Sequence, residues 1–169
     1  ETGYQLEIDN EYIMSPKDLC TVGFIDQVLD AGITVLKIEG RARSPEYVKT
    51  VAEAYREGAD AYVDGLYDRA KAEELENRLK TVFNRGFWDG YYLGRKMGEW
   101  SNEYGSQATK RKVYLGKGMN YFSNLGVAEF LMETGELQVG DEILITGPTT
   151  GVLEMEIKEL RVDLKVVEQ

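Results

Sequence analysis

The sequence predicts an α/β region followed by an all-β region. Short β-like runs alternate with helical runs over residues 1–83, glycine and aromatic residues crowd residues 84–109, and short β-rich runs separated by turn residues fill residues 110–169. Alternating strands and helices are typical of a parallel α/β architecture, and closely spaced short strands of a small antiparallel sandwich or barrel. We therefore expect two domains, 1–83 and 110–169, joined by a connection over 84–109.

The first predicted strand–helix unit covers residues 12–32. Tyr12-Ile13-Met14 is a short apolar run, and Ser15-Pro16-Lys17-Asp18 then offers an N-cap, a proline at the first helical position and an acid in the first turn. A helix is expected to start there and to end at Gly32. Its apolar positions recur at three- and four-residue steps: Leu19, Val22, Ile25, Val28 and Leu29.

The second unit begins with Ile33 to Ile38, which is β-branched and mostly apolar, as a strand buried on both faces would be. Ser44-Pro45-Glu46 repeats the cap chemistry and predicts a helix to about Gly65. The apolar stripe of that helix is Val48, Val51, Tyr55, Ala59 and Tyr62. Two such units are too few to close a barrel, so we expect the end of a larger α/β barrel.

A third helix is predicted over residues 70–83, with Leu75, Leu79, Val82 and Phe83 on one side. Residues 84–105 predict an extended connection with local packing. The strands predicted beyond it are Val113 to Gly116, Val127 to Leu131, Glu142 to Thr146, Leu153 to Leu160 and Val162 to Val167.

Composition limits the classes of protein. No apolar run approaches the roughly 20 residues needed to cross a bilayer, and no charged-then-apolar leader opens the chain, so we expect no membrane partner and a cytoplasmic protein. The chain opens with Glu1 rather than Met, which predicts a C-terminal piece of a longer polypeptide that supplies the missing N-terminal barrel half. A tag remnant is the alternative. Exposed strand edges could also pair with another copy.

Residue counts exclude several kinds of site. The chain has no histidine, which removes Ser-His and Cys-His nucleophile pairs, and one cysteine, Cys20, which excludes an internal disulfide. The net charge of -10 opposes simple nucleic-acid binding, since phosphate affinity comes from clustered Lys and Arg. Lys110-Arg111-Lys112 is the tight basic run, and a solvated linker or strand edge is its favoured interpretation.

Two loops are expected to lie side by side at the same end of the predicted barrel, because functional groups in parallel architectures lie at the carboxyl ends of strands. They are Ser15 to Cys20 and Glu39 to Arg43. The second places Glu39, Arg41 and Arg43 after a buried strand, where guanidinium groups suit bidentate binding of carboxylate or phosphate. A structural Glu39–Arg41 ion pair that pins the loop is the alternative, and both interpretations stay open.

Cys20 and the aromatic run of residues 83–94 also have two interpretations each. A lone cysteine is more often a small buried hydrophobe, but one thiol can also supply one of four cluster ligands whose partners lie upstream. The aromatic run could stack on bases or on hydrophobic peptide, although packing of an irregular segment is favoured.

Four strings of this sequence resemble the U-thirty-two peptidase family, the collagenase-like proteins. They are residues 12–20 (Tyr-Ile-Met-Ser-Pro-Lys-Asp-Leu-Cys), residues 36–48 (Leu-Lys-Ile-Glu-Gly-Arg-Ala-Arg-Ser-Pro-Glu-Tyr-Val), residues 84–92 (Asn-Arg-Gly-Phe-Trp-Asp-Gly-Tyr-Tyr) and residues 147–151 (Gly-Pro-Thr-Thr-Gly). The resemblance spans essentially the whole chain. In one departure, Met14 stands before Ser15 where the family commonly has Asn.

The resemblance implies a TIM-like barrel ending in residues 1–83 and an elongation-factor-like β-barrel after it. Members are named peptidases, yet several take part in oxygen-independent hydroxylation of tRNA, ribosomal RNA or ubiquinone precursors. In those members cysteines hold an iron–sulfur cluster, and the cysteine of the Lys-Asp-Leu-Cys motif matches Cys20. We therefore expect a cluster in the intact protein and none in this fragment, which we expect to be inactive alone.

The leading hypothesis is an iron–sulfur-dependent RNA hydroxylase. Glu39, Arg41 and Arg43 are the expected catalytic residues. Prephenate is implicated as oxygen donor in the tRNA-modifying branch, and Arg41 and Arg43 are carboxylate partners for such a dianion by chemical inference. RNA or substrate contacts are expected from Lys17, Arg85, Lys110, Arg111 and Lys112. The alternatives are a collagenase-like peptidase of unknown mechanism and a β-barrel that binds RNA or protein.

Overall fold

The structure combines an α/β part with a β-rich part, as the sequence predicts at that level. It is a computed structural model that describes residues 15–167. The elements in chain order are β1 (Asp18–Leu19), the 3-10 turn η1 (Val22–Phe24), α1 (Ile25–Asp30), α2 (Pro45–Val63), α3 (Arg69–Leu79), β2 (Phe87–Trp88), β3 (Gly116–Phe122), β4 (Val127–Met132), β5 (Glu142–Gly147), β6 (Gly151–Glu156), β7 (Leu160–Val162) and β8 (Lys165–Val167). The chain divides into two compact units, Glu1–Lys110 and Arg111–Gln169.

Helix α2 confirms the start predicted from the sequence. Ser44 has an extended backbone at the N-cap and Pro45 occupies the first turn, where its missing N–H costs nothing. The hydroxyl of Ser44 donates to the Glu46 carboxylate at 2.5 Å rather than to the backbone. The helix ends at Val63, and Gly65 beyond it adopts a positive φ of 70°, which a residue with a side chain adopts less readily.

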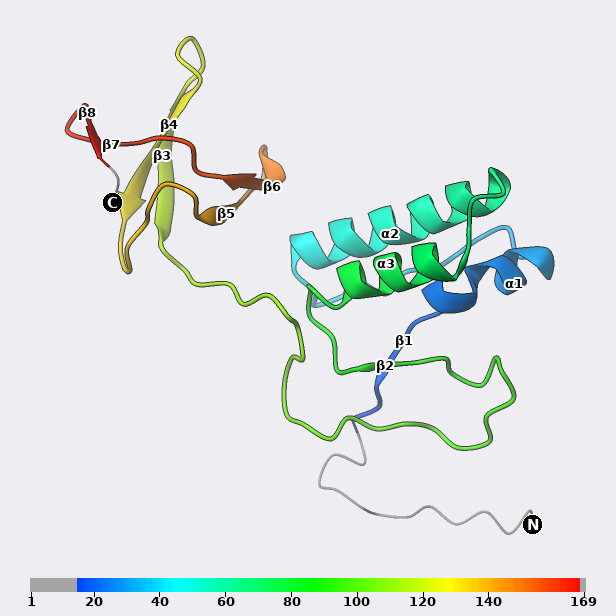
Figure 1. The fold of residues 1–169 in the computed structure, drawn as a ribbon. Helices are drawn as coiled ribbons and strands as arrows, with labels where there is room; N and C mark the ends of the chain where they lie inside the picture. Colours follow the sequence, from blue (N-terminus) through cyan, green and yellow to red (C-terminus); the bar gives the residue numbers. More distant parts are fainter. Residues whose placement is uncertain (1–14, 168–169) are drawn as a thin grey trace. The chain divides into compact units, whose positions relative to one another are not determined.

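The hydrophobic core of the first unit lies where α2, α3 and η1 meet (Figure 1). Its fully or nearly fully buried members are Val22, Val51, Ala54, Leu75 and Leu79. Gly58 permits this close packing, because a Cβ there would lie 3.2 Å from Cδ1 of Leu75. Burying a leucine side chain contributes about 2 kcal/mol, so Leu75 and Leu79 are major sources of stability.

The N-terminal end of α3 is fixed by Asp68, whose carboxylate accepts a hydrogen bond from the Lys71 N–H at 2.8 Å. The prediction extends this helix to residue 83, but it ends at Leu79. Lys80 is the C-cap residue, and the Thr81 hydroxyl beyond it donates to the Arg78 carbonyl at 2.7 Å. Val82 and Phe83 follow in a turn.

The helix predicted from residue 15 starts later than expected. Asp18–Leu19 forms β1 instead and pairs in parallel with β2. The Asp18 N–H donates to the Gly86 carbonyl and the Cys20 N–H to the Trp88 carbonyl, each at 2.9 Å. Distant backbone acceptors thus outweigh the local cap signal, and helical structure begins at Val22. The strand predicted at 12–14 lies outside the described residues.

The strand predicted over residues 33–38 is not formed. These residues have no regular secondary structure, and Val35 is 80% exposed. A buried parallel strand draws its hydrogen bonds from neighbours on both sides, and the described residues place no strand beside this segment.

The connection over residues 84–109 is largely irregular, as predicted. Backbone hydrogen bonds tie it to the end of α3: Gln107 N–H donates to the Asn84 carbonyl at 2.7 Å and Thr109 N–H to the Lys80 carbonyl at 2.9 Å. Asn84 and Ser101 are buried, but Tyr91, Tyr92 and Leu93 are exposed, so the favoured packing interpretation holds for only part of the aromatic run.

The second unit consists of antiparallel hairpins: β3 with β4, β5 with β6 and β7 with β8. The turn between β5 and β6 falls in the Gly147 to Gly151 string, with Gly151 at a φ of 69°. The run Val113 to Gly116 lies mostly before β3 rather than in it. The described strands pair two by two, so the predicted closed barrel stays a prediction.

Candidate functional site

The candidate site is built around the carboxylate of Asp18, on β1. This carboxylate accepts hydrogen bonds from the guanidinium groups of Arg43 at 3.3 Å and Arg85 at 3.0 Å, and from the Arg85 N–H at 2.9 Å. The Asp18 side chain is only 17% exposed. One carboxylate thus brings together two arginines that are far apart in the sequence, and two positive charges surround one negative charge.

Arg43 is held by aromatic rings as well as by Asp18. Its guanidinium carbon lies 4.1 Å from the centroid of the Phe83 ring and 5.3 Å from that of Tyr47. Such cation–π contacts favour the charged group over the ring face. The rings cover the faces of the guanidinium, whereas its N–H donors lie at its edge, where a carboxylate or phosphate would bind.

The loop before Arg43 is tight. The Arg43 N–H donates to the Gly40 carbonyl at 3.0 Å, and Ala42 adopts a positive φ of 58°, which is strained for a residue with a Cβ. Gly40 is required by space, because a Cβ there would lie 2.9 Å from Cγ2 of Val48. The turn therefore fixes the backbone position from which the Arg43 side chain extends.

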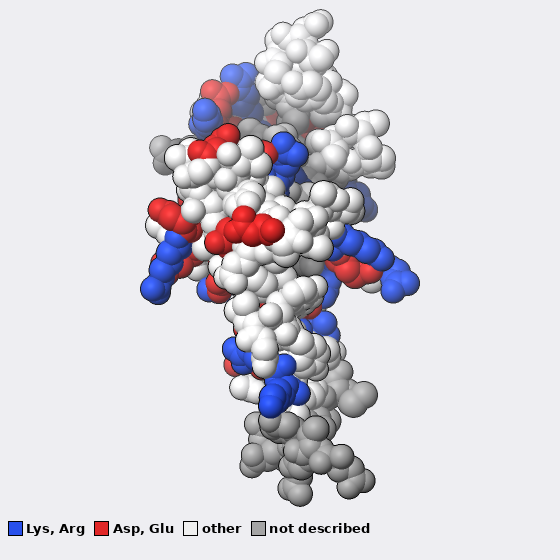
Figure 2. All heavy atoms as spheres, turned by 90° about the vertical axis from the view of Figure 1, so that its right-hand side faces the viewer, with Lys and Arg blue, Asp and Glu red and all other residues white. Residues whose placement is uncertain are grey.

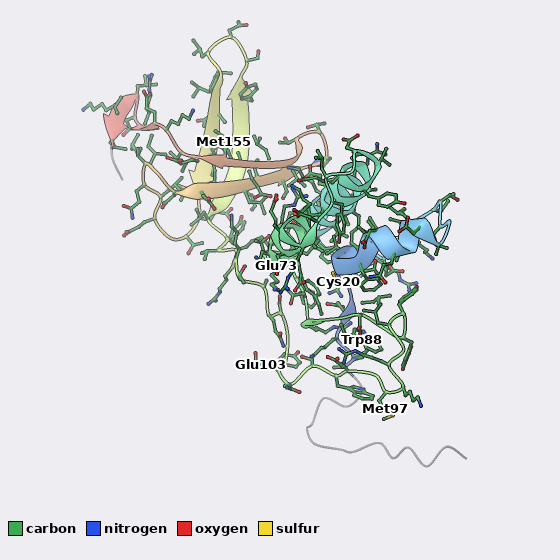
Figure 3. All side chains as sticks on the ribbon, turned by 45° about the vertical axis from the view of Figure 1, so that its right-hand side comes forward. Cys20, Glu73, Trp88, Met97, Glu103 and Met155 are labelled. Atoms are coloured by element: carbon green, nitrogen blue, oxygen red, sulfur yellow. The ribbon has the colours of Figure 1, made fainter. Side chains whose placement is uncertain are left out.

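Cys20 lies two residues after Asp18, at the junction of β1 and η1 (Figure 3). Its side chain packs against the core of the first unit together with Tyr47 and Tyr55. The Tyr55 hydroxyl accepts a hydrogen bond from the Thr21 N–H at 2.9 Å, contacts the Thr21 hydroxyl at 3.2 Å and also bonds the Cys20 thiol. Tyr55 therefore joins α2 to the thiol segment.

Burial is the largest cause of the pKa shifts of Cys20, Tyr47 and Tyr55. Burial raises the pKa of the Cys20 thiol, and hydrogen bonds from the Val22 backbone and Tyr55 offset this only in part. Burial and the nearby thiol raise the pKa of Tyr55 to about 12. Burial also raises the pKa of Tyr47, against the opposing effect of the Arg43 guanidinium. The thiol and both phenols are therefore neutral at pH 7.

The structure places the other sequence-predicted residues outside this cluster. Glu39 accepts a hydrogen bond from the Arg41 backbone N–H at 2.8 Å, and both residues are exposed. The Lys17 ammonium pairs with the Glu99 carboxylate at 2.6 Å. Arg43 and Arg85 are thus brought together at Asp18, whereas Glu39, Arg41 and Lys17 face other partners or solvent.

The basic run Lys110, Arg111 and Lys112 is exposed and lies at the boundary between the two units. On the face drawn in Figure 2, blue and red spheres are interspersed among the described residues, without a broad area of one sign. Two open surface depressions lie elsewhere among the described residues, one beside Arg56 and Arg78 and one beside Tyr67. Neither is lined by Cys20 or Arg43.

The described residues do not by themselves make an iron–sulfur site. Cys20 is the single cysteine of the chain and supplies one thiolate donor at most. Within residues 15–167 no group of three or more His, Cys, Asp or Glu side chains is placed to hold a metal ion. A cluster would need ligands from outside this chain's sequence.

Sequence reasoning missed Asp18, Tyr47, Tyr55 and Phe83 as parts of the site. Asp18 was interpreted as the first-turn acid of a helix, and Tyr55 and Phe83 as positions on apolar stripes. The available signal was that Asp18 stands inside the Lys-Asp-Leu-Cys string, next to the candidate ligand. A carboxylate two residues from Cys20 on an extended segment points to the same side as the thiol.

Several known proteins are similar to this chain in sequence. The family model for Peptidase family U32 matches residues 1–102. The chain is 57% identical, over its whole length and 41% of the relative, to a protein named collagenase from Porphyromonas gingivalis. It is 34% identical, over 98% of the chain and 40% of the relative, to an uncharacterized protease of Methanocaldococcus jannaschii. It is 32% identical, over 84% of the chain and 33% of the relative, to tRNA hydroxylation protein P1 of Bacillus subtilis.

The chain therefore belongs to peptidase family U32. This confirms the resemblance seen in the motifs. The chain spans less than half the length of the curated relatives it matches over nearly all of its own length, between 40% and 47% of each. No solved structure gives a significant match. Among the described helices, none has both the length and the hydropathy that crossing a bilayer requires.

Proposed function

We propose that the whole protein takes part in hydroxylation of tRNA and that this chain contributes an anion-binding part of its site. The supporting observation is the Asp18–Arg43–Arg85 cluster, which is built on a residue two positions before the single cysteine of a chain whose relatives include tRNA hydroxylation proteins. The cluster carries a net positive charge in a chain of net charge -10. A small anionic co-substrate fits it better than a long polyanion does.

The ligand of the Asp18–Arg43–Arg85 cluster is a small carboxylate. We propose that this ligand is prephenate, which acts as the oxygen donor. Asp18 uses one guanidinium donor group of each arginine, and a guanidinium has five N–H donors. The Nε of Arg85 is buried without a hydrogen-bond partner among the described residues. The remaining donors can bind a carboxylate in the bidentate geometry that arginine favours. Arg41, exposed on the neighbouring loop, is the further carboxylate partner that we propose.

Cys20 is the residue that would hold an iron–sulfur cluster in the whole protein, together with cysteines from outside this sequence. Such a cluster would supply electron transfer. The chain's own residues would position the thiol: the Cys20 N–H bonds the Trp88 carbonyl at 2.9 Å, and Tyr55 bonds the thiol. Binding as thiolate would release the thiol proton and reverse the effect of burial on its pKa.

The proposal also includes the fold of the whole protein. The α/β unit would complete a TIM-like barrel, and the hairpins would close into an elongation-factor-like barrel that docks RNA or protein. Each described sheet has two strands, and unpaired strand edges support pairing with further strands of the protein or with a second copy. A tRNA or rRNA substrate would place the reaction in the cytoplasm, with contacts from Lys110, Arg111 and Lys112.

Nucleoside analysis tests the proposal. The gene is deleted in its host, and the hydroxyuridine content of tRNA and rRNA is measured by mass spectrometry. We expect hydroxyuridine to fall in the deletion strain and to return with the intact gene. Unchanged hydroxylation of both tRNA and rRNA would refute the proposal.

A peptidase is the second candidate, favoured by the 57% identity to a protein named collagenase. Within this chain the chemistry opposes a cysteine nucleophile, because burial raises the pKa of Cys20, whereas an activated thiol has a lowered one. The chain also has no histidine to act as base. Cleavage of gelatin by the purified whole protein, retained after its iron is stripped, would favour this candidate.

A further inference from the structure

The segment between α3 and β2 carries two residues of the candidate site, one on each side of a buried asparagine (Figure 1). Phe83 covers the Arg43 guanidinium, with its ring centroid 4.1 Å from the guanidinium carbon, and the Arg85 guanidinium bonds the Asp18 carboxylate at 3.0 Å. Asn84 stands between Phe83 and Arg85 and is only 3% exposed. Asparagine is mostly found at the surface, and a buried amide needs hydrogen-bond partners.

The Asn84 side chain bonds the backbone on both sides of its own position. Its Nδ2 donates to the Lys80 carbonyl at 3.3 Å and to the Val82 carbonyl at 3.0 Å, and its Oδ1 accepts from the Gly86 N–H at 3.1 Å. The Asn84 carbonyl also accepts from the Gln107 N–H at 2.7 Å. The amide therefore closes the turn over residues 80–86 and fixes the backbone from which both flanking side chains extend.

Gly86 connects this turn to β1. It adopts a positive φ of 80°, and a Cβ on it would lie 3.2 Å from Oε1 of Gln107, so glycine suits the position on both counts. Its N–H bonds the Asn84 oxygen, and its carbonyl accepts from the Asp18 N–H at 2.9 Å. Asn84 is thus linked through Gly86 to the backbone of the residue whose carboxylate holds both arginines.

The contacts around this side chain suit an asparagine. Two carbonyls and one N–H surround it, and an amide offers two N–H donors and a carbonyl acceptor. A serine hydroxyl offers one donor, so at least one of the two carbonyls would lose its partner. An alanine would leave all three backbone groups without this partner.

We propose that Asn84 is a positioning residue for the small carboxylate bound by Arg43 and Arg85. By closing the turn, it holds the Phe83 ring over the Arg43 guanidinium and brings Arg85 to Asp18. The N–H donors that Asp18 leaves free then keep one geometry, which bidentate binding of a carboxylate requires. The inference rests on the anion site proposed above and adds the residue that orders it.

Prephenate binding to the purified whole protein tests the effect on the ligand. Isothermal titration calorimetry compares the wild type with Asn84→Ala, and neither protein differs from the other in charge. We expect Asn84→Ala to bind prephenate about tenfold more weakly, as loss of a residue that orients a metal ligand commonly does at metal sites. Asn84→Ser is expected to lie between the two, because it restores part of the hydrogen bonding.

Asn77→Ala is the matched control. Asn77 lies exposed on α3 in the same unit and takes the same substitution. It is expected to bind prephenate with wild-type affinity. Circular dichroism verifies that each variant is folded, and Asn84→Ser carries the test if Asn84→Ala does not fold.

The NMR signal of the Arg43 side chain tests the positioning without any ligand. In whole protein labelled with 15N-arginine, the Arg43 Nε–H signal is identified by its loss in Arg43→Lys. The Phe83 ring current shifts this signal upfield, because the guanidinium lies over the ring. We expect Asn84→Ala to reduce the shift, Asn84→Ser to reduce it less and Asn77→Ala to retain it.

The inference is overturned if Asn84→Ala retains the Arg43 shift, or if it loses the shift and still binds prephenate as the wild type does. Equal weakening by Asn77→Ala would also overturn it. Absence of prephenate binding by the wild type would instead refute the proposed ligand, and the Arg43 shift would then decide alone whether Asn84 orders the arginines.

Discussion

The Asp18 carboxylate accepts two hydrogen bonds from Arg85, one from the backbone N–H at 2.9 Å and one from the guanidinium at 3.0 Å. The same carboxylate accepts a third from Arg43 at 3.3 Å. It therefore fixes the segment before α2 and the segment after α3 to β1. The positions of both arginines depend on this one acidic side chain.

Asp18→Asn is expected to destabilise the first unit by about 2 kcal/mol, because it leaves two half-buried guanidinium groups without a counter-charge. Urea unfolding measures the change. Asp60→Asn is the matched control. It breaks an exposed ion pair with Arg56 and is expected to cost less than about 0.5 kcal/mol. Equal losses in both variants would contradict the account of Asp18.

Tyr55→Phe is expected to slow alkylation of Cys20 at a fixed pH. The hydrogen bond from Tyr55 lowers the thiol pKa, so its loss raises that pKa further and reduces the thiolate fraction. The rate of reaction with iodoacetamide between pH 7 and 9 measures this. Tyr104→Phe, at a residue 89% exposed, is expected to change nothing. Faster alkylation in the Tyr55 variant would show that its hydroxyl only shields the thiol.

Stability is expected to fall at alkaline pH because of the same two groups. A group whose pKa is raised by folding contributes stability below its unfolded pKa and loses it as pH rises through the folded pKa. For Tyr55 that window runs from about 10 to the folded pKa of about 12. Urea unfolding midpoints across this range should decline more gently in Tyr55→Phe than in the wild type. An identical decline in both would contradict this origin.

Leu75→Ala is expected to cost 2–5 kcal/mol, roughly the range for a fully buried leucine. The cavity would open where α3 meets Gly58 of α2. Leu66→Ala, at a residue 70% exposed, is the control and is expected to cost less than about 0.5 kcal/mol. Thermal or urea unfolding distinguishes them, and a small loss at Leu75 would place the core elsewhere.

How much the sequence predicts depends on how local the interactions are. Helix α2 was predictable because Ser44, Pro45 and Gly65 carry the signals for its ends. The start of the first helix was not, because Asp18 and Cys20 take backbone partners from Gly86 and Trp88, far along the chain. A local cap pattern does not contain that information.

The candidate site likewise contains one contact that the sequence predicted and others that it could not. The order of strands and loops predicted that Arg43 lies near the Ser15 to Cys20 segment. In the structure Arg43 bonds Asp18 of that segment. The part played by Arg85 could not be derived in that way, since its position depends on the pairing of β2 with β1. Tyr55 was visible only as one member of an apolar stripe.

The most direct test of the proposed function is complementation of the deletion strain with the Arg43→Lys gene, measured as hydroxyuridine in tRNA. Lysine keeps the charge but loses the planar fork that would bind a carboxylate. We predict that the wild-type gene and the exposed-site control Arg56→Lys restore the modification, and that Arg43→Lys leaves it at least about tenfold lower. Full restoration by Arg43→Lys, with all three proteins present at equal levels, would contradict the role of the guanidinium cluster.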